Sequence, residues 1–265
     1  MGILNLTPDS FYDGGRFRHE SSILKQVEKM LADGADFIDI GGYSSRPGAD
    51  FVAETEELKR LTSVLEAVVK NFPETLISVD TFRSKVADSC LEIGASMIND
   101  ISGGDSDKMM MDVVAKHQVP YIIMHMRGNP QTMQKRTEYD NVVTDVMKAL
   151  SEKVRLARSK KINDLIIDPG FGFAKTLQQN YDLLGKLQLF KNFESPILVG
   201  LSRKSMVYKM LETAPEHALN GTSVLHTVAL LKGVHILRVH DVKEAVECIR
   251  LVSEINTNST LQGLH

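Results

Sequence analysis

Short apolar runs alternate with amphipathic helical segments along the chain, and this alternation restricts the possible folds more than any other feature of the sequence. In the first example, Ile23, Val27 and Met30 recur with helical spacing, and the apolar run 37–40 follows directly. A run this short is expected of a strand buried on both faces of a parallel sheet. Together with Gly-Ile-Leu at 2–4, such runs lie at 37–40, 76–80, 97–100, 121–125, 165–168, 196–200 and 234–238.

Eight runs separated by helices predict a parallel sheet with helices outside it, and eight units favour closure into a single-domain (β/α)8 TIM barrel of the α/β class. An open, doubly wound sheet is the main alternative. It is less favoured because no G-x-G-x-x-G turn follows the first run, and because polar residues end nearly all the runs instead of one switch point. Since no linker rich in Pro, Gly or Ser interrupts the chain, we expect residues 1–265 to be one domain ending in a polar tail of about ten residues.

Two expectations concern the segments around the first strands. The first run has about three residues before Asn5, whereas strands usually have five or six, so we expect a strand that is short or preceded by missing residues. Segments 5–15 and 41–50 contain Gly and Pro and are long for loops of such a barrel. We expect them to act as mobile lids.

Composition and charge exclude several classes of function. The chain has 31 Lys and Arg residues against 34 Asp and Glu residues, a formal net charge of −3, so we expect no nucleic-acid partner. An anionic ligand then requires a local cluster of cations. The two cysteines, Cys90 and Cys248, are too few for a disulfide framework and lack metal-site spacing. No apolar segment reaches the ~18 residues of a membrane span. We therefore expect a cytoplasmic protein with no membrane partner.

Hydrogen-bonding or charged residues follow all eight runs, at the strand ends where a TIM barrel places its active site. These segments are 5–10, 41–48, 80–81, 99–100, 125–126, 168–173, 202–204 and 238–241. Taken alone, any one of them is more often a loop residue that caps the next helix. Polar residues at all eight ends predict an active site.

Three of these residues favour a flat heterocycle as ligand. Asp80, Asn99 and Asp168 have short, directional side chains that can pair with the amide and amino edge of such a ring. A carboxylate accepts two N–H bonds, and an Asn both donates and accepts. We therefore expect the three side chains to read the edge of one ring.

Four other residues favour a phosphate-sized anion. Arg238 and His240 are two residues apart, so they face the same way if the strand continues, and Arg46 and Lys204 can join them. A solvated edge with a capping His is the alternative. Few carboxylates remain for an all-protein metal cage, so a metal ion would be Mg²⁺ held by one or two protein oxygens, phosphates and water. His125 has no His or Cys partner at ligand spacing, and we expect it to pack in the core.

Together, these segments resemble the dihydropteroate synthase family of pterin-binding barrels. The matching text is MGILNLTPDSF at 1–11, GGYSSRPG at 41–48, SVDT at 78–81, INDI at 98–101, MHMRGNP at 124–130, DPGFGF at 168–173, SRKS at 202–205 and RVHD at 238–241. The resemblance extends to about residue 254. Each piece is weak alone, but their ordered combination is specific. Ser45 stands where the family often has Thr before Arg-Pro-Gly, and it keeps the hydroxyl.

The resemblance implies a reaction and the residues that perform it. The family joins 6-hydroxymethyl-7,8-dihydropterin diphosphate to 4-aminobenzoate, giving 7,8-dihydropteroate and diphosphate, with Mg²⁺ as cofactor and a homodimer formed through the late helices. The implied pterin pocket is Asp80, Asn99, Met124, Asp168, Lys204 and Arg238. The implied diphosphate contacts are Asn5, Ser45, Arg46, Arg238 and His240, with Asn5 also the Mg²⁺ ligand. The implied aminobenzoate region is Phe11, Ser45, Pro47, Phe173, Ser202 and Lys204. Catalysis is assigned to Asn5, Asp80, Lys204, Arg238 and His240.

The implied mechanism is dissociative. Diphosphate departs with help from Mg²⁺ and the cations, and the arylamine attacks a carbocation-like methylene. An arylamine is a competent nucleophile without a strong base, which agrees with the lack of a catalytic triad in the sequence. Two alternatives remain: a methyltetrahydrofolate methyltransferase, against which Arg46, Arg238 and His240 argue, and a catalytically silent pterin-binding barrel.

Overall fold

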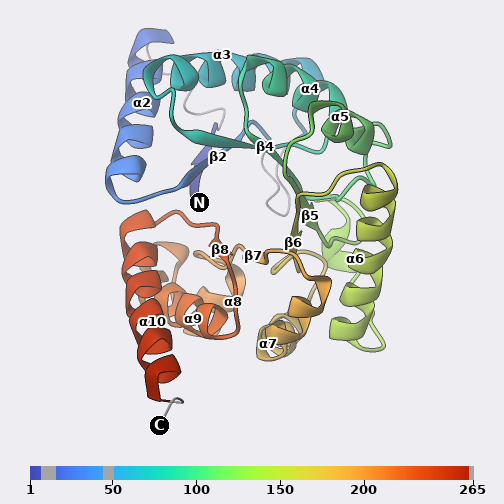
Figure 1. The fold of residues 1–265 in the computed structure, drawn as a ribbon, viewed down its shortest axis with the longest axis vertical. Coiled ribbons are helices and arrows are strands. Elements are labelled where there is room, and N and C mark those ends of the chain that lie inside the picture. Colours follow the sequence, from blue (N-terminus) through green and yellow to red (C-terminus); the bar gives the residue numbers. More distant parts are fainter. Residues whose placement is uncertain (7–15, 44–50, 263–265) are drawn as a thin grey trace.

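The computed structural model describes residues 1–6, 16–43 and 51–262, and its strands follow the order of the predicted apolar runs (Figure 1). Six parallel strands pair with their neighbours in sequence: β1 (Gly2–Asn5), β2 (Phe37–Gly41), β3 (Leu76–Asp80), β4 (Met97–Asp100), β5 (Tyr121–Met124) and β6 (Leu165–Asp168). A second parallel pair consists of β7 (Leu198–Val199) and β8 (Ile236–Leu237). Each strand coincides with one predicted run, and β1 is a short strand of four residues.

Backbone hydrogen bonds join the two groups of strands into a closed ring. Between β6 and β7, Ile167 N donates to Pro196 O at 2.9 Å, and Ile167 forms a parallel bridge with Ile197. Between β8 and β1, Ile3 N donates to Val239 O at 2.9 Å. A closed ring of eight parallel strands confirms the (β/α)8 barrel and excludes the open, doubly wound sheet.

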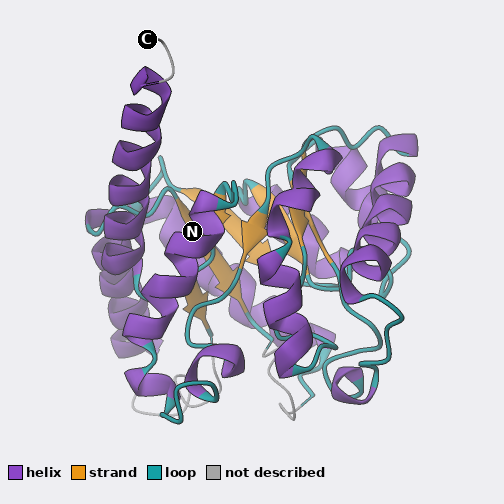
Figure 2. Ribbon diagram, turned by 90° about the horizontal axis from the view of Figure 1, so that it is seen from below, coloured by secondary structure: helices purple, strands orange, loops and turns teal. Residues whose placement is uncertain are grey.

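Helices surround the strands on the outside (Figure 2). They are α2 (Arg16–Ala32), α3 (Glu54–Asn71), α4 (Ser84–Ile93), α5 (Met110–His117), α6 (Val142–Ser159), α7 (Leu177–Gly185), α8 (Ser205–Tyr208), α9 (Leu219–Leu231) and α10 (Val242–Gln262), with short 3-10 turns at Met133–Lys135, Leu187–Phe193 and Pro215–His217. Helix α8, between β7 and β8, is only four residues long. The expected polar tail falls at the end of α10, which continues to Gln262. Within the described part of the chain, no helix has the length and apolar character to cross a membrane.

The inward-facing residues of the barrel form an apolar floor with a polar layer above it. Outward residues such as Ile38, Ile77 and Ile98 are buried in the main core beneath the helices. A separate cluster fills the interior and consists of Met1, Phe37, Met97, Ile122, Ile166, Leu198 and Ile236. Two residues further along β2 and β4 to β8, towards the carboxyl ends, the inward positions are Asp39, Asn99, Met124, Asp168, Gly200 and Arg238. The period of two thus places three of the predicted polar residues, Asn99, Asp168 and Arg238, in one layer above the apolar cluster.

Candidate active site

Strand register places predicted site residues side by side at the carboxyl end of the barrel. Asn5 is paired with Gly41, Gly41 with Asp80, and Asp80 with Asn99. A Cβ atom at Gly41 would lie 3.6 Å from Asp80 Oδ2 and 3.8 Å from Asn5 Oδ1. Asn5 and Asp80 therefore flank a position at which the chain has no side chain.

Arg238 forms hydrogen bonds to two carboxylates at the carboxyl end of the barrel. Its Nε donates to Asp39 Oδ2 at 2.6 Å, and its Nη2 donates to Asp80 Oδ2 at 2.7 Å. Asn99 Nδ2 also donates to Asp39 Oδ2, at 3.2 Å. Asp39, whose side chain is fully buried, thus connects Asn99 to Arg238, and Arg238 connects them to Asp80. The sequence prediction missed Asp39 because it lies in the middle of an apolar run. A single carboxylate inside a strand buried on both faces was the available signal, since a buried charge needs a partner.

The charges in this cluster depend on one another. Burial raises the pKa of Asp80 to about 7, although the Arg238 guanidinium opposes the shift. Burial lowers the pKa of Arg238, but Asp39 and Asp80 raise it by more, so its pKa is raised overall. Arg238 is therefore a permanent cation, and much of its charge is already balanced by carboxylates. The sequence prediction assigned Arg238 to both the pterin pocket and the diphosphate contacts, and it did not include the pairing of Arg238 with Asp39.

Asp168 and Lys204 form a second part of the site. Asp168 Oδ1 accepts a hydrogen bond from Gly170 N at 2.7 Å. Burial raises the pKa of Asp168, and Lys204 is the main group that opposes this shift. Lys204 Nζ donates to Phe171 O and lies 4.6 Å from the centre of the Phe173 ring. Burial lowers the pKa of Lys204 to about 8, with Asp168 opposing it. The two predicted residues therefore support each other's ionised form.

Apolar side chains cover one side of this pair. Met124 packs in a small cluster with Met126, Met133 and Ile101, and the partly buried Phe173 packs against it. Met124 is also paired with Asp168 in the register of β5 and β6. Met124 and Phe173 thus give the polar layer an apolar wall suited to a flat ring.

Ser202 and His240 connect the loops after β7 and β8. Ser202 Oγ lies 3.0 Å from His240 Nδ1 and accepts a hydrogen bond from His240 N at 3.2 Å. A bidentate pair joins the same loops, because Arg203 Nε and Nη2 donate to the Asp241 carboxylate at 2.8 and 2.6 Å. The imidazole of His240 is exposed at the rim. These contacts confirm that 202–204 and 238–241 are neighbours.

Asn5 is the described residue that fits the expected metal ligand. Its amide is exposed at the end of β1 and, as described above, flanks Gly41 with Asp80. The described residues contain no group of three or more His, Cys, Asp and Glu side chains able to hold a metal ion. One protein oxygen completed by phosphate oxygens and water is a common way to hold Mg²⁺. The donor set therefore fits Mg²⁺ bound together with a diphosphate.

Four predicted residues, Phe11, Ser45, Arg46 and Pro47, lie outside the described residues, as do parts of both expected lids. Arg83 holds the chain on both sides of 44–50. Its Nη2 donates to Val52 O at 2.7 Å, and its guanidinium lies 5.4 Å from the Tyr43 ring and 5.5 Å from the Phe51 ring. The buried Glu57 carboxylate pairs with Arg83 in turn. The sequence prediction missed this contribution of Arg83 and Glu57.

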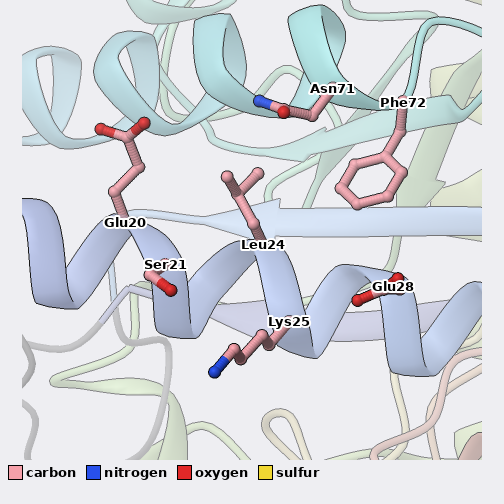
Figure 3. Close-up of a pocket in the computed structure, with 7 residues that line it drawn as sticks. All are labelled: Glu20, Ser21, Leu24, Lys25, Glu28, Asn71 and Phe72. Carbon is pink, nitrogen blue, oxygen red and sulfur yellow. The ribbon is translucent and has the colours of Figure 1, made fainter.

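A surface hollow between α2 and α3 is a separate feature (Figure 3). It is lined by Glu20, Ser21, Leu24, Lys25, Glu28, Asn71 and Phe72. None of these residues belongs to the polar layer of the barrel. The site is therefore defined by the contacts at the strand ends and not by this hollow.

Comparison with known proteins agrees with this geometry. A family model described as "Pterin binding enzyme" matches residues 1–240. The dihydropteroate synthase of Escherichia coli K12 is 43% identical over 254 residues, which cover 95% of this chain and 89% of that protein. The dihydropteroate synthase of Bacillus subtilis is 39% identical over 254 residues, covering 95% and 86%.

Solved structures show the same similarity. A Yersinia pestis dihydropteroate synthase in complex with a sulfonamide drug superposes with a TM-score of 0.89 at 40% identity, covering 97% of this chain and 93% of that one. A Xanthomonas albilineans dihydropteroate synthase with 4-aminobenzoic acid also has a TM-score of 0.89, at 36% identity, covering 96% and 92%. The chain therefore belongs to the pterin-binding enzyme family and, within it, to the dihydropteroate synthases.

Proposed function

We propose that this chain binds 6-hydroxymethyl-7,8-dihydropterin diphosphate and 4-aminobenzoate at the carboxyl end of its barrel and joins them into 7,8-dihydropteroate, releasing diphosphate. One observation carries this proposal: Asp80, Asn99 and Asp168 are buried at the carboxyl ends of β3, β4 and β6, with the cations Lys204 and Arg238 beside them. Carboxylates and an amide in that arrangement suit the N–H edge of a pterin.

Some of these residues bind the pterin, and others balance the charge of the departing diphosphate. Asp168 and Asn99 hold the pterin edge, and the wall of Met124 and Phe173 keeps water from the ring. His240 at the rim and Lys204 lie on the loops nearest the departing diphosphate. When bound at Asn5, Mg²⁺ supplies charge neutralisation for that leaving group. As the C–O bond to diphosphate breaks, its electron pair leaves with the diphosphate. The amine of 4-aminobenzoate donates its lone pair to the methylene carbon and then releases one N–H proton to water, which gives the secondary amine of dihydropteroate.

The apolar surface of the last two long helices supports a homodimer. Val224 and Leu231 on α9 are 54% exposed, and Leu251 and Ile255 on α10 are 69% and 56% exposed. The helices α9 and α10 pack against each other, so these side chains lie on adjoining elements. Exposed apolar residues in such number mark an association surface, and a two-fold dimer is the commonest outcome. Light scattering should give the mass of a dimer, and Leu251→Arg should give the mass of a monomer.

One assay separates the proposed reaction from its two alternatives. The protein is supplied with the pterin diphosphate, 4-aminobenzoate and Mg²⁺, and dihydropteroate is followed by chromatography. Formation of dihydropteroate supports the proposal. Binding of the pterin without product would favour a silent pterin-binding barrel, and transfer of a methyl group from methyltetrahydrofolate to a corrinoid would favour the methyltransferase. The same preparation should unfold in a single transition if residues 1–265 form one domain.

A further inference from the structure

Lys175 is a buried lysine at the end of the loop that follows β6, and its ammonium group is fully hydrogen-bonded. Its side chain is 4% exposed. Its Nζ lies 3.1 Å from His125 Nδ1, 2.8 Å from Gly170 O and 3.0 Å from Phe173 O. An ammonium has three donors and no acceptor, so three acceptors satisfy it completely. A buried polar network in which every group is hydrogen-bonded makes the surrounding structure rigid.

The three acceptors belong to two segments, the end of β5 and the turn that follows β6. His125 follows directly on β5, whereas Gly170 and Phe173 belong to the turn that follows Asp168. Gly170 has a φ of +73°, and a Cβ there would lie 2.0 Å from His125 O, so the turn is pressed against the end of β5. Lys175 therefore ties the turn to the neighbouring strand.

The contact also defines the state of His125. Because the lysine ammonium can only donate, His125 Nδ1 must accept, which requires the neutral imidazole with its proton on Nε2. Burial lowers the pKa of His125 to about 2, in agreement with a neutral ring. His125 is buried, as the sequence predicted, but its contact with Lys175 was not expected.

Building on the proposed function, we infer that Lys175 is a positioning residue for this reaction. It holds the 170–173 turn so that Phe173 stands beside the aminobenzoate, and its positive charge keeps the Asp168 carboxylate ionised for the pterin. Lys175 acts through these two residues without touching a substrate. Its hydrogen bond to Gly170 O secures the residue whose N–H binds Asp168.

Electrostatics agree with the second part of this role. Burial raises the pKa of Asp168, and three cations oppose this shift: Lys204 from the loop after β7, Lys175 from the loop after β6, and Arg238 directly after β8. The neighbouring His125 is neutral. Burial lowers the pKa of Lys175 to about 7, with Asp168 opposing the shift. Below about pH 7, Lys175 is thus charged, and its charge opposes protonation of the buried Asp168 carboxyl.

The test compares Lys175→Met, which keeps the length of the side chain without its charge, with Lys175→Arg, which keeps the charge. Binding of 6-hydroxymethylpterin is measured against pH, and the KM for 4-aminobenzoate is measured separately from kcat. Loss of the cation raises the pKa of Asp168, so the acidic limb of pterin binding should move to higher pH by ~1 unit, a tenfold change in proton affinity. The KM for 4-aminobenzoate should rise roughly tenfold, since a displaced Phe173 weakens that contact. Lys175→Arg should restore the acidic limb.

A second pair of variants keeps the inference testable if Lys175→Met does not fold. His125→Asn keeps an acceptor near the position of Nδ1, and His125→Leu removes it. His125→Leu should raise the KM for 4-aminobenzoate several-fold, and His125→Asn should not. Unchanged KM and an unchanged acidic limb in folded Lys175→Met, or an unchanged KM in His125→Leu, would overturn the inference. A wild-type protein that binds no pterin would instead refute the proposed function itself.

Discussion

Arg238 and Asp39 form a hydrogen-bonded ion pair of 2.6 Å in which the carboxylate is completely buried at the centre of β2. The same guanidinium donates to Asp80 at 2.7 Å, so one cation directly after β8 joins carboxylates on β2 and β3. Since Asp39 also accepts from Asn99, this pair fixes the orientation of three predicted pterin contacts. Asp39 thus determines the geometry of the site although the sequence prediction did not assign it there.

Replacing Asp39 by Asn should destabilise the fold. Arg238 would lose one of its two charged partners inside the barrel, and the free energy of unfolding should fall by roughly 3 kcal/mol, the lower end for a broken buried ion pair because Asp80 remains. Urea denaturation measures the change. Asp88→Asn is the matched control, since Asp88 pairs with Lys116 and His117 at the surface. The free energy of unfolding of this variant should fall by less than ~1 kcal/mol. Equal losses in both variants would contradict the role of the buried pair.

Replacing Asp168 by Asn should weaken pterin binding. The change removes one acceptor from the pair that reads the pterin edge and should lower the binding free energy by about 1–3 kcal/mol, because a buried donor is left unpaired. Calorimetry with 6-hydroxymethylpterin measures the change. Asp164→Asn serves as the control, because Asp164 is exposed just before the opposite end of β6. Unchanged affinity in Asp168→Asn would refute recognition of the edge by this carboxylate.

The activity should fall on the alkaline side near pH 8. Burial lowers the pKa of Lys204 to about 8, so the ammonium is present below this pH and is lost as the pH rises through it. Loss of that cation removes a charge that balances Asp168 and the departing diphosphate. Lys204→Arg keeps the charge throughout this range, so its profile of kcat/KM against pH should lack the alkaline limb. An alkaline limb of unchanged position in Lys204→Arg would contradict the assignment.

Replacing His240 by Ala should slow turnover more than it weakens pterin binding. His240 stands at the rim beside Ser202, where the diphosphate is expected and the pterin ring is not. We expect kcat to fall by a factor on the order of 10–100, while binding of 6-hydroxymethylpterin stays within about twofold. His217→Ala, a change of another exposed histidine on Pro215–His217, should alter neither quantity. Equal losses of turnover and binding would refute the anion role of His240.

The fold was predictable because its signals are local. Helical spacing of apolar residues and short buried runs occur in contiguous segments, so the positions of all eight strands agree with the structure. The positions of Asp80, Asn99 and Asp168 at one edge of the barrel were predictable for a related reason, since each lies at the end of a run and parallel strands bring their carboxyl ends together.

The remaining site residues depend on contacts that no local pattern encodes. Asp39 lies within an apolar run, and only the closed barrel brings it to Arg238, 199 residues away. Lys175 follows a matched motif but reaches His125 across 50 residues. The balance of charge at Arg238 was also hidden, because a sequence gives the sign of a charge without its partners.

The most direct test of the account is the ratio of diphosphate to dihydropteroate formed when this protein is the only enzyme present. Diphosphate and dihydropteroate are quantified together, with both substrates and Mg²⁺ present and again with 4-aminobenzoate omitted. The account predicts that one diphosphate appears for each dihydropteroate formed, and that Asp168→Asn lowers both to the same extent. Diphosphate released without dihydropteroate when both substrates are present, or no release from a protein that binds the pterin, would contradict it.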